Sequence, residues 1–399
     1  MPSVPAAEID RRVHAVQDQL AREDSPVDLL LVVQKADLFY LSGTLQQCHL
    51  ALPAAGAPRL LVRKVRETAE GDSAIRDIVP LRSFRELPGH VRDLCGEPPW
   101  RIGMELDVLP VGLWQTYRGV LGDDAEIVDC SPALLAARAR KSAWELDQFR
   151  DAARLHPLLF GDPLRRLLAR DVSPYDLQAQ LEAEARRLGH CGLVRLRGLD
   201  AETGIGIAVS GPDGAVPSNS MFPIGGAGPH AWVSHGGTRA PVGRDVPVIL
   251  DFLMSTTGYH VDCSRMAVRG AFPDRAASIL ERIGEVLRGM EGRLRAGVRP
   301  SEIHRSAVEE AAAAGLGEGF MGPPGYQVSF VGHGVGLEVN ELPVIGPRSD
   351  RPLAAGNVIA LEPKYTDQEY GVIGIENTYV VTEDGAEKLT TATEAVVEG

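Results

Sequence analysis

The first third of the chain alternates short apolar runs with amphipathic stretches. Apolar runs at 28–33, 60–62, 78–79 and 101–104 predict buried strands, and a further short strand is expected at 39–43. The pattern over 111–120 has the spacing of a helix. Strand and helix patterns that alternate in this way are typical of an α/β domain. We therefore predict such a domain over residues 1–133.

The remaining two thirds follow a different order, and we assign residues 134–399 to a second, larger domain. Helical patterns cover 145–168, 276–294 and 301–314, and Ser173-Pro174 has the cap and first-turn residues that begin another helix. Strand patterns occur at 205–209, 246–252, 259–268, 328–331, 358–361 and 372–381. Gly-rich turns join these elements, which predicts an α+β domain on a curved, largely antiparallel sheet.

Composition narrows the range of partners. Forty-one Lys and Arg against 54 Asp and Glu give a formal net charge of −13, which argues against nucleic acid as a partner because a phosphate backbone needs clustered cations. The longest aliphatic stretch, 29–33, is far shorter than the ~20 residues that cross a bilayer, so no membrane partner is expected. No secretory leader is visible at the N-terminus, which makes a cytoplasmic location the expectation.

Two aspartates interrupt apolar strand patterns, where an isolated carboxylate is costly. Asp251 lies within the run 248–252, and Asp262 lies in the strand pattern that follows. If the hairpin is centred between Thr256 and Thr257, the two aspartates are directly opposed, with Cβ atoms roughly 4.5–5.5 Å apart. Such a pair repels unless a cation lies between the carboxylates, so a metal site is predicted.

Three more candidate ligands occur later in the chain. Glu362 follows the apolar run 359–361, Glu376 interrupts another apolar run, and His333 lies between two glycines. Carboxylates with one imidazole suit manganese, cobalt, iron or zinc. The four carboxylates balance the charge of two divalent ions and leave a bridging hydroxide as a nucleophile. Serine hydrolase, zincin and P-loop motifs are absent from the sequence.

These residues and their neighbours resemble the creatinase/prolidase/aminopeptidase P group of metallopeptidases, and the resemblance covers the whole chain. It is carried by Asp251, Asp262, Gly332-His333-Gly334-Val335-Gly336, Glu362-Pro363 and Gly374-Ile375-Glu376-Asn377. The resemblance implies a pita-bread catalytic domain that is preceded in the sequence by a smaller creatinase-like α/β domain. It also implies two divalent metal ions, with manganese expected first and cobalt, zinc or iron as alternatives. The expected assembly is a homodimer.

The resemblance also implies a role for each ligand. Asp251 would chelate one ion, Asp262 and Glu376 would bridge both, and His333 and Glu362 would hold the other. Glu362 would also act as the catalytic proton shuttle. The expected reaction is cleavage of an Xaa-Pro or related amide bond by a metal-bridged hydroxide.

Three positions depart from the group's usual pattern. Asn340 stands where peptidase members have a histidine, and we assign it to substrate binding; Gly374 stands where they often have an arginine. One alignment places His235, sixteen residues before Asp251, as the catalytic and substrate-binding histidine, with His230 as a weaker competitor. A second alignment, through Ser218, deletes this histidine.

The departures keep other functions open. The expected substrate is a short peptide or another small molecule. The alternative to an Xaa-Pro peptidase is a metal-dependent hydrolase or lyase for a small non-peptide compound, similar to ectoine hydrolase or a sulfonium lyase. A third hypothesis is a metal-free binding module that keeps the fold.

Overall fold

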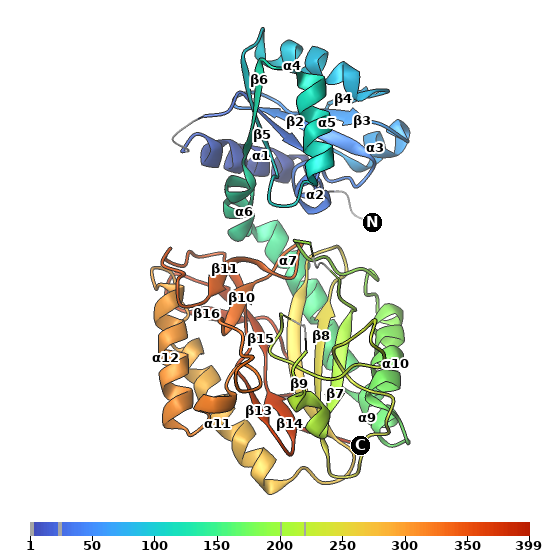
Figure 1. The fold of residues 1–399 in the computed structure, drawn as a ribbon, viewed down its shortest axis with the longest axis vertical. Helices are drawn as coiled ribbons and strands as arrows, with labels where there is room; N and C mark the ends of the chain where they lie inside the picture. The colour runs from blue at the N-terminus through green and yellow to red at the C-terminus, as the bar shows by residue number, and fades with distance from the viewer. Residues whose placement is uncertain (1–3, 23–25, 200–201, 219–220) are drawn as a thin grey trace. The chain divides into compact units, whose positions relative to one another are not determined.

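The computed structural model describes residues 4–22, 26–199, 202–218 and 221–399. The chain divides into two compact units (Figure 1). The first unit runs to Arg138 and includes the segment that begins at Arg197, and the second comprises Ala139–Leu196 and the chain from Glu202 to Gly399. Among the described residues, no helix is both long and apolar enough to cross a membrane.

The first unit is built on a mixed sheet with helices packed against it. As far as the described residues go, the sheet has six strands in the order β4-β3-β2-β1-β5-β6. The strands are β1 (Leu29–Val32), β2 (Cys48–Pro53), β3 (Arg59–Val62), β4 (Asp77–Pro80), β5 (Trp100–Met104) and β6 (Ala125–Asp129). The helices are α1 (Ala6–Leu20), α2 (Lys35–Ser42), α3 (Arg66–Asp72), η1 (Phe84–Glu86), α4 (Leu87–Cys95), α5 (Val111–Leu121) and α6 (Ser131–Ala139).

The strand predicted at 39–43 is wrong, because this segment belongs to helix α2. The side chain of Gln34 accepts a hydrogen bond from the backbone N–H of Asp37 and caps the first turn. Gly43 ends the helix in the left-handed conformation, with φ 74°. Local capping at both ends thus overrides the strand preference of Phe39 and Tyr40.

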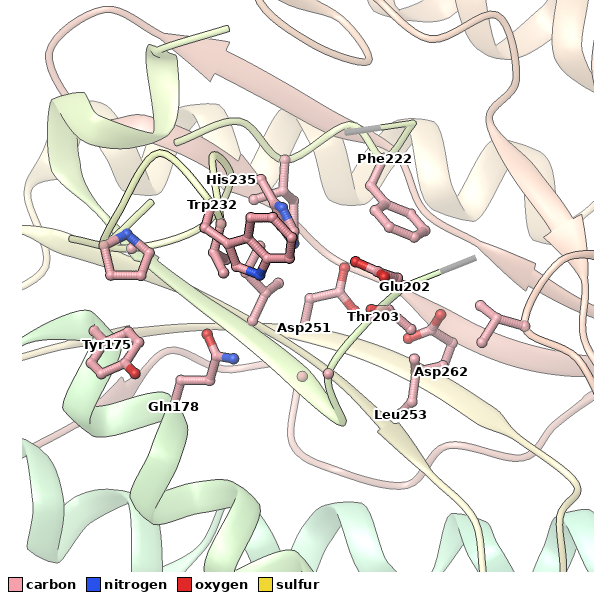
Figure 2. A pocket seen from close by; sticks show the side chains of 18 residues that line it. Tyr175, Gln178, Glu202, Thr203, Phe222, Trp232, His235, Asp251, Leu253 and Asp262 are labelled. Atoms are coloured by element: carbon pink, nitrogen blue, oxygen red, sulfur yellow. The ribbon is translucent and has the colours of Figure 1, made fainter. Parts of the chain in front are cut away.

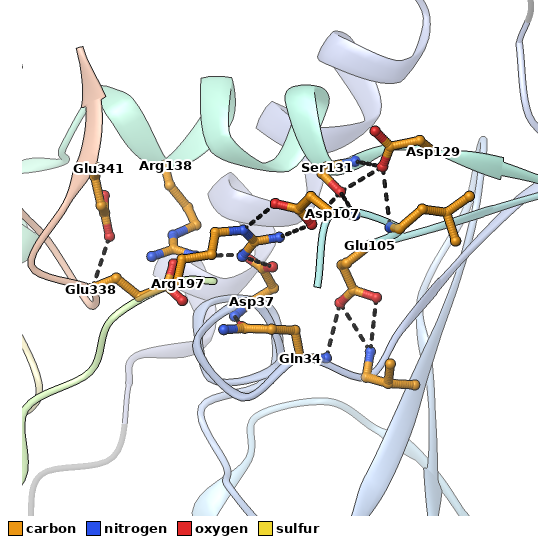
Figure 3. A network of polar contacts seen from close by, with 12 residues as sticks. Gln34, Asp37, Glu105, Asp107, Asp129, Ser131, Arg138, Arg197, Glu338 and Glu341 are labelled. Atoms are coloured by element: carbon orange, nitrogen blue, oxygen red, sulfur yellow. Dashed lines mark hydrogen bonds and ion pairs between the residues drawn. The ribbon is translucent and has the colours of Figure 1, made fainter. Parts of the chain in front are cut away.

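A buried ionic network ties the end of the first unit to its centre (Figure 3). The carboxylate of Asp37 accepts from Arg138 at 2.6 Å through Oδ1 and from Arg197 at 2.9 Å through Oδ2. Arg197 also donates to Asp107, which in turn accepts from the hydroxyl of Ser131 at 2.6 Å. The side chain of Asp37 is fully buried, so its charge depends on these two guanidinium groups.

Replacing Asp37 by alanine should destabilise the first unit by about 3 kcal/mol or more, because buried guanidinium groups lose their counter-charge. Native-state hydrogen exchange of the β1 amides in the full chain would measure this loss. The matched control is Asp93→Ala, which removes an exposed partner of Arg59 and should cost less than about 1 kcal/mol. Equal losses in the two variants would contradict the assigned role of the network.

In the second unit, the described residues form three sheets flanked by helices. Within its described residues the sheet orders are β11-β10-β12-β15-β16, β13-β14 and β17-β9-β8-β7. The helices are α7 (Ala143–Ala153), α8 (Leu155–Leu159), α9 (Asp162–Leu168), α10 (Pro174–Arg187), η2 (Gly211–Ala215), α11 (Asp274–Glu291), α12 (Pro300–Ala313) and η3 (Gly317–Gly319). The strands are β7 (Gly206–Ser210), β8 (Pro247–Met254), β9 (Val261–Val268), β10 (Gly332–Gly334), β11 (Glu341–Ile345), β12 (Val358–Leu361), β13 (Lys364–Asp367), β14 (Gly371–Gly374), β15 (Asn377–Val381), β16 (Ala386–Lys388) and β17 (Val397–Glu398).

Two separate cores cover the two faces of the β7–β9 sheet. Val248, Leu250 and Phe252 of β8 pack with residues of α8, α9 and α10, while Ile249 packs in the core that includes α11 and α12. Figure 1 shows α10 and α11 on opposite sides of these strands. Because side chains alternate along a strand, Asp251 lies on the same face as Ile249, between the sheets.

Asp251 and Asp262 are not directly opposite each other as predicted, because the register of the β8–β9 pair differs from the predicted one by two residues. Asp251 is paired with Ser264 and Asp262 with Leu253. The turn between β8 and β9 is therefore displaced toward the C-terminal strand. A shift of two residues preserves the face on which a side chain lies, so the two aspartates remain diagonal neighbours on one face.

Three other predicted elements differ from the structure. The strand expected at 328–331 is absent there, and the ladder begins at Gly332 instead. The helical run 145–168 is broken into α7, α8 and α9, in a segment that contains Pro157, Gly161 and Pro163. The strand expected at 372–381 is divided into β14 and β15 by a break at residues 375–376.

Candidate metal centre

The second unit brings its five candidate ligands from five segments of the chain to one place. Asp251 comes from β8, Asp262 from β9 and His333 from β10, while Glu362 follows β12 and Glu376 lies in the break between β14 and β15. Ligand atoms of Asp262, His333 and Glu376 all lie within 4.8 Å of one another, and all three side chains are buried.

His333 is oriented for binding a cation through one ring nitrogen. Its Nδ1 lies 3.1 Å from the carbonyl oxygen of Val339 and 3.2 Å from that of Gly334. A carbonyl oxygen only accepts hydrogen bonds, so Nδ1 carries the proton and Nε2 presents its lone pair. This Nε2 lies 3.5 Å from Glu362 Oε1, 3.9 Å from Glu376 Oε1 and 4.0 Å from Asp262 Oδ2.

Two of these carboxylate oxygens also lack a hydrogen-bond partner in the described part of the chain, which is a further sign of a metal site. Oε1 of Glu362 and Oε1 of Glu376 are buried and have no hydrogen-bond partner among the described residues. A buried oxygen without a partner loses the hydration it had in water, a cost that a bound cation removes. The donor atoms around His333 Nε2 therefore match the kind of set that binds a divalent ion.

The other half of the cluster contains a residue that the sequence analysis missed. The ammonium of Lys364 donates to Glu362 Oε2 at 2.6 Å and to Glu376 Oε2 at 2.9 Å, and it lies 3.4 Å from Asp251 Oδ2. Its side chain is completely buried. Lysine is rarely buried without a paired charge, and here three carboxylates surround it.

The electrostatics of the cluster follow from this crowding. Burial raises the pKa of Glu376 to about 8, with the carboxylates of Asp251 and Glu362 adding to the effect and Lys364 opposing it. Burial and the charges of Glu376 and Asp251 likewise raise the pKa of Asp262 well above its usual range. Burial alone would lower the pKa of Lys364, but the three carboxylates hold it well above its usual value. The carboxylates thus need positive charge, and the lysine is a charged ammonium.

Arg265 holds the chain break that carries Glu376. Its guanidinium donates to the backbone carbonyl of Glu376 at 2.8 Å and to the side chain of Asn377 at 2.8 Å. Ser264, the neighbour of Arg265 on β9, donates its hydroxyl to Glu376 Oε2 at 2.7 Å. Since Arg265 is fully buried, it fixes the path of the chain where the β14 strand pattern stops. Sequence reasoning missed this residue as well.

A cavity of about 390 Å³ opens beside the cluster (Figure 2). Asp251 and Asp262 line it from the metal side, and His235 and Trp232 line it from the loop before β8. Its other walls include Tyr175 and Gln178 from α10, with Glu202, Thr203 and Phe222. The described residues that line the cavity include no lysine and no arginine.

The candidate substrate residues lie in different surroundings. His235 is partly buried at the cavity wall, and this burial lowers the pKa of its imidazole. His230, in the same loop, is exposed. Asn340 is also exposed, whereas its neighbour Val339 lines the cavity. The substrate-binding assignments of His235 and Asn340, and the alignment through Ser218, stay predictions.

Sequence signals for the missed residues were weak but present. Lys364 directly follows Glu362-Pro363 in a segment between two apolar runs, where a cation beside a candidate ligand could have been noticed. Arg265 interrupts the strand pattern that contains Asp262. For Glu202 and Trp232, which come from loops, we find no sequence signal that points to the cavity.

Two family models match this chain. The model of metallopeptidase family M24 matches residues 147–383, and that of the creatinase/prolidase N-terminal domain matches residues 12–140. A protein named probable dipeptidase PepE from Mycobacterium tuberculosis is 27% identical over 383 residues, which cover 92% of this chain and 90% of that protein.

Solved structures show the same fold. The structure of an Xaa-Pro dipeptidase from Bacillus anthracis has a TM-score of 0.81 and 21% identity, covering 99% of this chain and all of that one. Dipeptidase PepE from Mycobacterium ulcerans has a TM-score of 0.78 and 22% identity, covering 100% and 99% of the two chains. The expected pita-bread fold, preceded in the sequence by a creatinase-like domain, is thereby confirmed. The chain belongs to metallopeptidase family M24 and is a hydrolase of the Xaa-Pro peptidase-like type.

Proposed function

We propose that this chain is a metal-dependent hydrolase that cleaves an amide bond in a short peptide or a similar small molecule. The observation that carries the proposal is the pair of unpartnered oxygens, Glu362 Oε1 and Glu376 Oε1, beside the free Nε2 of His333. Family membership supports a divalent ion at this place. Manganese as the ion, the homodimer and the cytoplasmic location stay predictions.

The residues that would hold the ion are His333, Glu362, Glu376 and Asp262, with Asp251 at the cavity side of the cluster. A divalent ion there supplies Lewis acidity and lowers the pKa of a water molecule. His333 keeps its Nε2 free because its Nδ1 proton is directed at Val339. The proton-shuttle role of Glu362, and the two-ion arrangement expected from the resemblance, stay predictions.

We propose that His235 donates a hydrogen bond to the substrate. It lines the same cavity as Asp251 and Asp262 (Figure 2). Burial favours its neutral form, which can donate one hydrogen bond to the carbonyl oxygen on which negative charge develops. Nothing in this role requires His235 to bind the metal.

The cavity chemistry favours a substrate with a positively charged or neutral end. The aromatic side chains of Trp232 and Phe222, together with the carboxylate of Glu202, suit an amino group or another cation. The ring of Tyr175 already has the guanidinium of Arg239 at 4.0 Å from its centroid. A free dipeptide carboxylate would find no cationic side chain among the described lining residues. This observation also supports the second candidate function, hydrolysis of a small non-peptide amide or cyclic compound.

The metal requirement is tested with His333→Ala. This variant should lose its bound divalent ion and at least 100-fold of the hydrolytic rate, because the imidazole is the neutral donor of the set. Elemental analysis and turnover of the metal-reconstituted protein would measure both losses. Full metal content in the variant would refute the assigned centre.

His235→Ala should retain the metal content of the parent protein and lower kcat by about 100-fold, the usual scale for the loss of one acid–base or oxyanion group. His230→Ala is the matched control from the same loop and should leave kcat unchanged. Parallel measurements of kcat and bound metal decide the question. An unaffected His235→Ala enzyme would favour the alignment through Ser218.

A substrate panel tests the chemistry of the cavity. Xaa-Pro dipeptides with a free carboxylate should be hydrolysed at least about tenfold less efficiently than the same compounds with an amidated end, since the carboxylate finds no cation and meets the acidic cavity. Values of kcat/KM for both series, with manganese, cobalt, zinc and iron in turn, provide the comparison. Preference for the free acids would overturn this substrate assignment.

A further inference from the structure

The ammonium of Lys364 lies among the carboxylates where a bound cation would be expected. It has three N–H donors, and three carboxylate oxygens lie around it, from Glu362 at 2.6 Å, Glu376 at 2.9 Å and Asp251 at 3.4 Å. A divalent ion bound by Asp251 and by the same oxygen of Glu376 would need to enter this space. The ammonium would then lie against the ion, with like charges in contact.

The lysine side chain is held in this place by its surroundings. Lys364 on β13 is paired with Gly374 on β14, and a Cβ atom at residue 374 would lie 2.5 Å from the lysine Cγ and 3.0 Å from its Cβ. Only a glycine at 374 leaves room for this side chain. Residue 374 is the position where members of the resembled group often have an arginine, and in this chain a side chain at 374 would clash with Lys364.

The remaining donors form one further cation position. The two oxygens of each carboxylate, in Glu362 and in Glu376, have different surroundings. Oε2 accepts a hydrogen bond from Lys364, whereas Oε1 has no hydrogen-bond partner among the described residues and faces His333. Donor atoms around a tetrahedral ion with bonds of about 2.0–2.2 Å lie roughly 3.3–3.6 Å apart. The distance of 3.5 Å from His333 Nε2 to Glu362 Oε1 fits this range, and those of 3.9 Å and 4.0 Å to Glu376 and Asp262 require only small side-chain movements.

We propose that Lys364 is a built-in cation that occupies one of the two cation positions, so that the centre binds a single divalent ion at His333, Glu362, Glu376 and Asp262. The lysine supplies one positive charge and contacts Asp251, Glu362 and Glu376 in place of a second ion, and it leaves the ion at His333 as the exchangeable one. This inference rests on the metal site of the proposed function and specifies its stoichiometry.

The decisive experiment uses the unaltered full-length chain. Metal-free protein is titrated with Mn²⁺, and the bound ion is counted by calorimetry and by elemental analysis after gel filtration. One ion per chain is expected, with the electron paramagnetic resonance signal of an isolated Mn²⁺ ion. Two ions per chain, with the signal of an exchange-coupled pair, would overturn the inference but leave the proposed metal-dependent function intact. No bound ion at saturating Mn²⁺ would overturn both.

A variant tests whether the lysine is the cause. Lys364→Ala opens the space between Asp251, Glu362 and Glu376, and the soluble variant should bind two Mn²⁺ ions per chain. The matched control is Lys141→Ala, which removes another buried lysine of the same unit, paired with Glu341 at 3.2 Å, and should still bind one ion. A Lys364→Ala protein that still binds one ion would refute the role of the lysine. If this variant fails to fold, the ion count of the unaltered chain decides.

Discussion

The need to neutralise four neighbouring carboxylates governs the structure of the catalytic unit. Asp262, Glu362 and Glu376 are almost completely buried, and Asp251 keeps only a small exposed fraction. Like charges at such distances in a medium of low polarity repel strongly, so neighbouring cations stabilise the ionised carboxylates. The lysine provides one internal cation, and the unpartnered oxygens beside His333 define where another belongs.

The fold brings the four carboxylates together by joining sheets whose strands are distant in sequence. Asp262 of β9 is held by Thr378 of β15, which donates its hydroxyl to the aspartate carbonyl and accepts from the aspartate N–H. Arg265, also on β9, holds the backbone of Glu376 at the strand break. The β8–β9 and β14–β15 segments are thus fixed to each other by buried hydrogen bonds directly behind the ligands, which limits how far the carboxylates can move.

The sequence predicted most of the strands and the identity of the clustered acids, because an aspartate within an apolar run conflicts with burial. It failed where local geometry decided the outcome. The side-chain cap at Gln34 made a helix of a segment rich in aromatic residues, and the position of the turn after Met254 moved the register by two. Lys364 escaped notice because a lysine near a strand end is normally exposed, and only the tertiary arrangement of three carboxylates explains its burial.

An internal ammonium differs from a metal ion in that it cannot dissociate. In a centre neutralised by ions alone, chelation would leave every carboxylate without counter-charge and would weaken the fold. Here three of the four carboxylates keep the contact with Lys364 whatever the ion does. Activity and folding are thereby separated: the supply of free metal would set how many molecules are active, while the metal-free protein remains folded and can be reloaded.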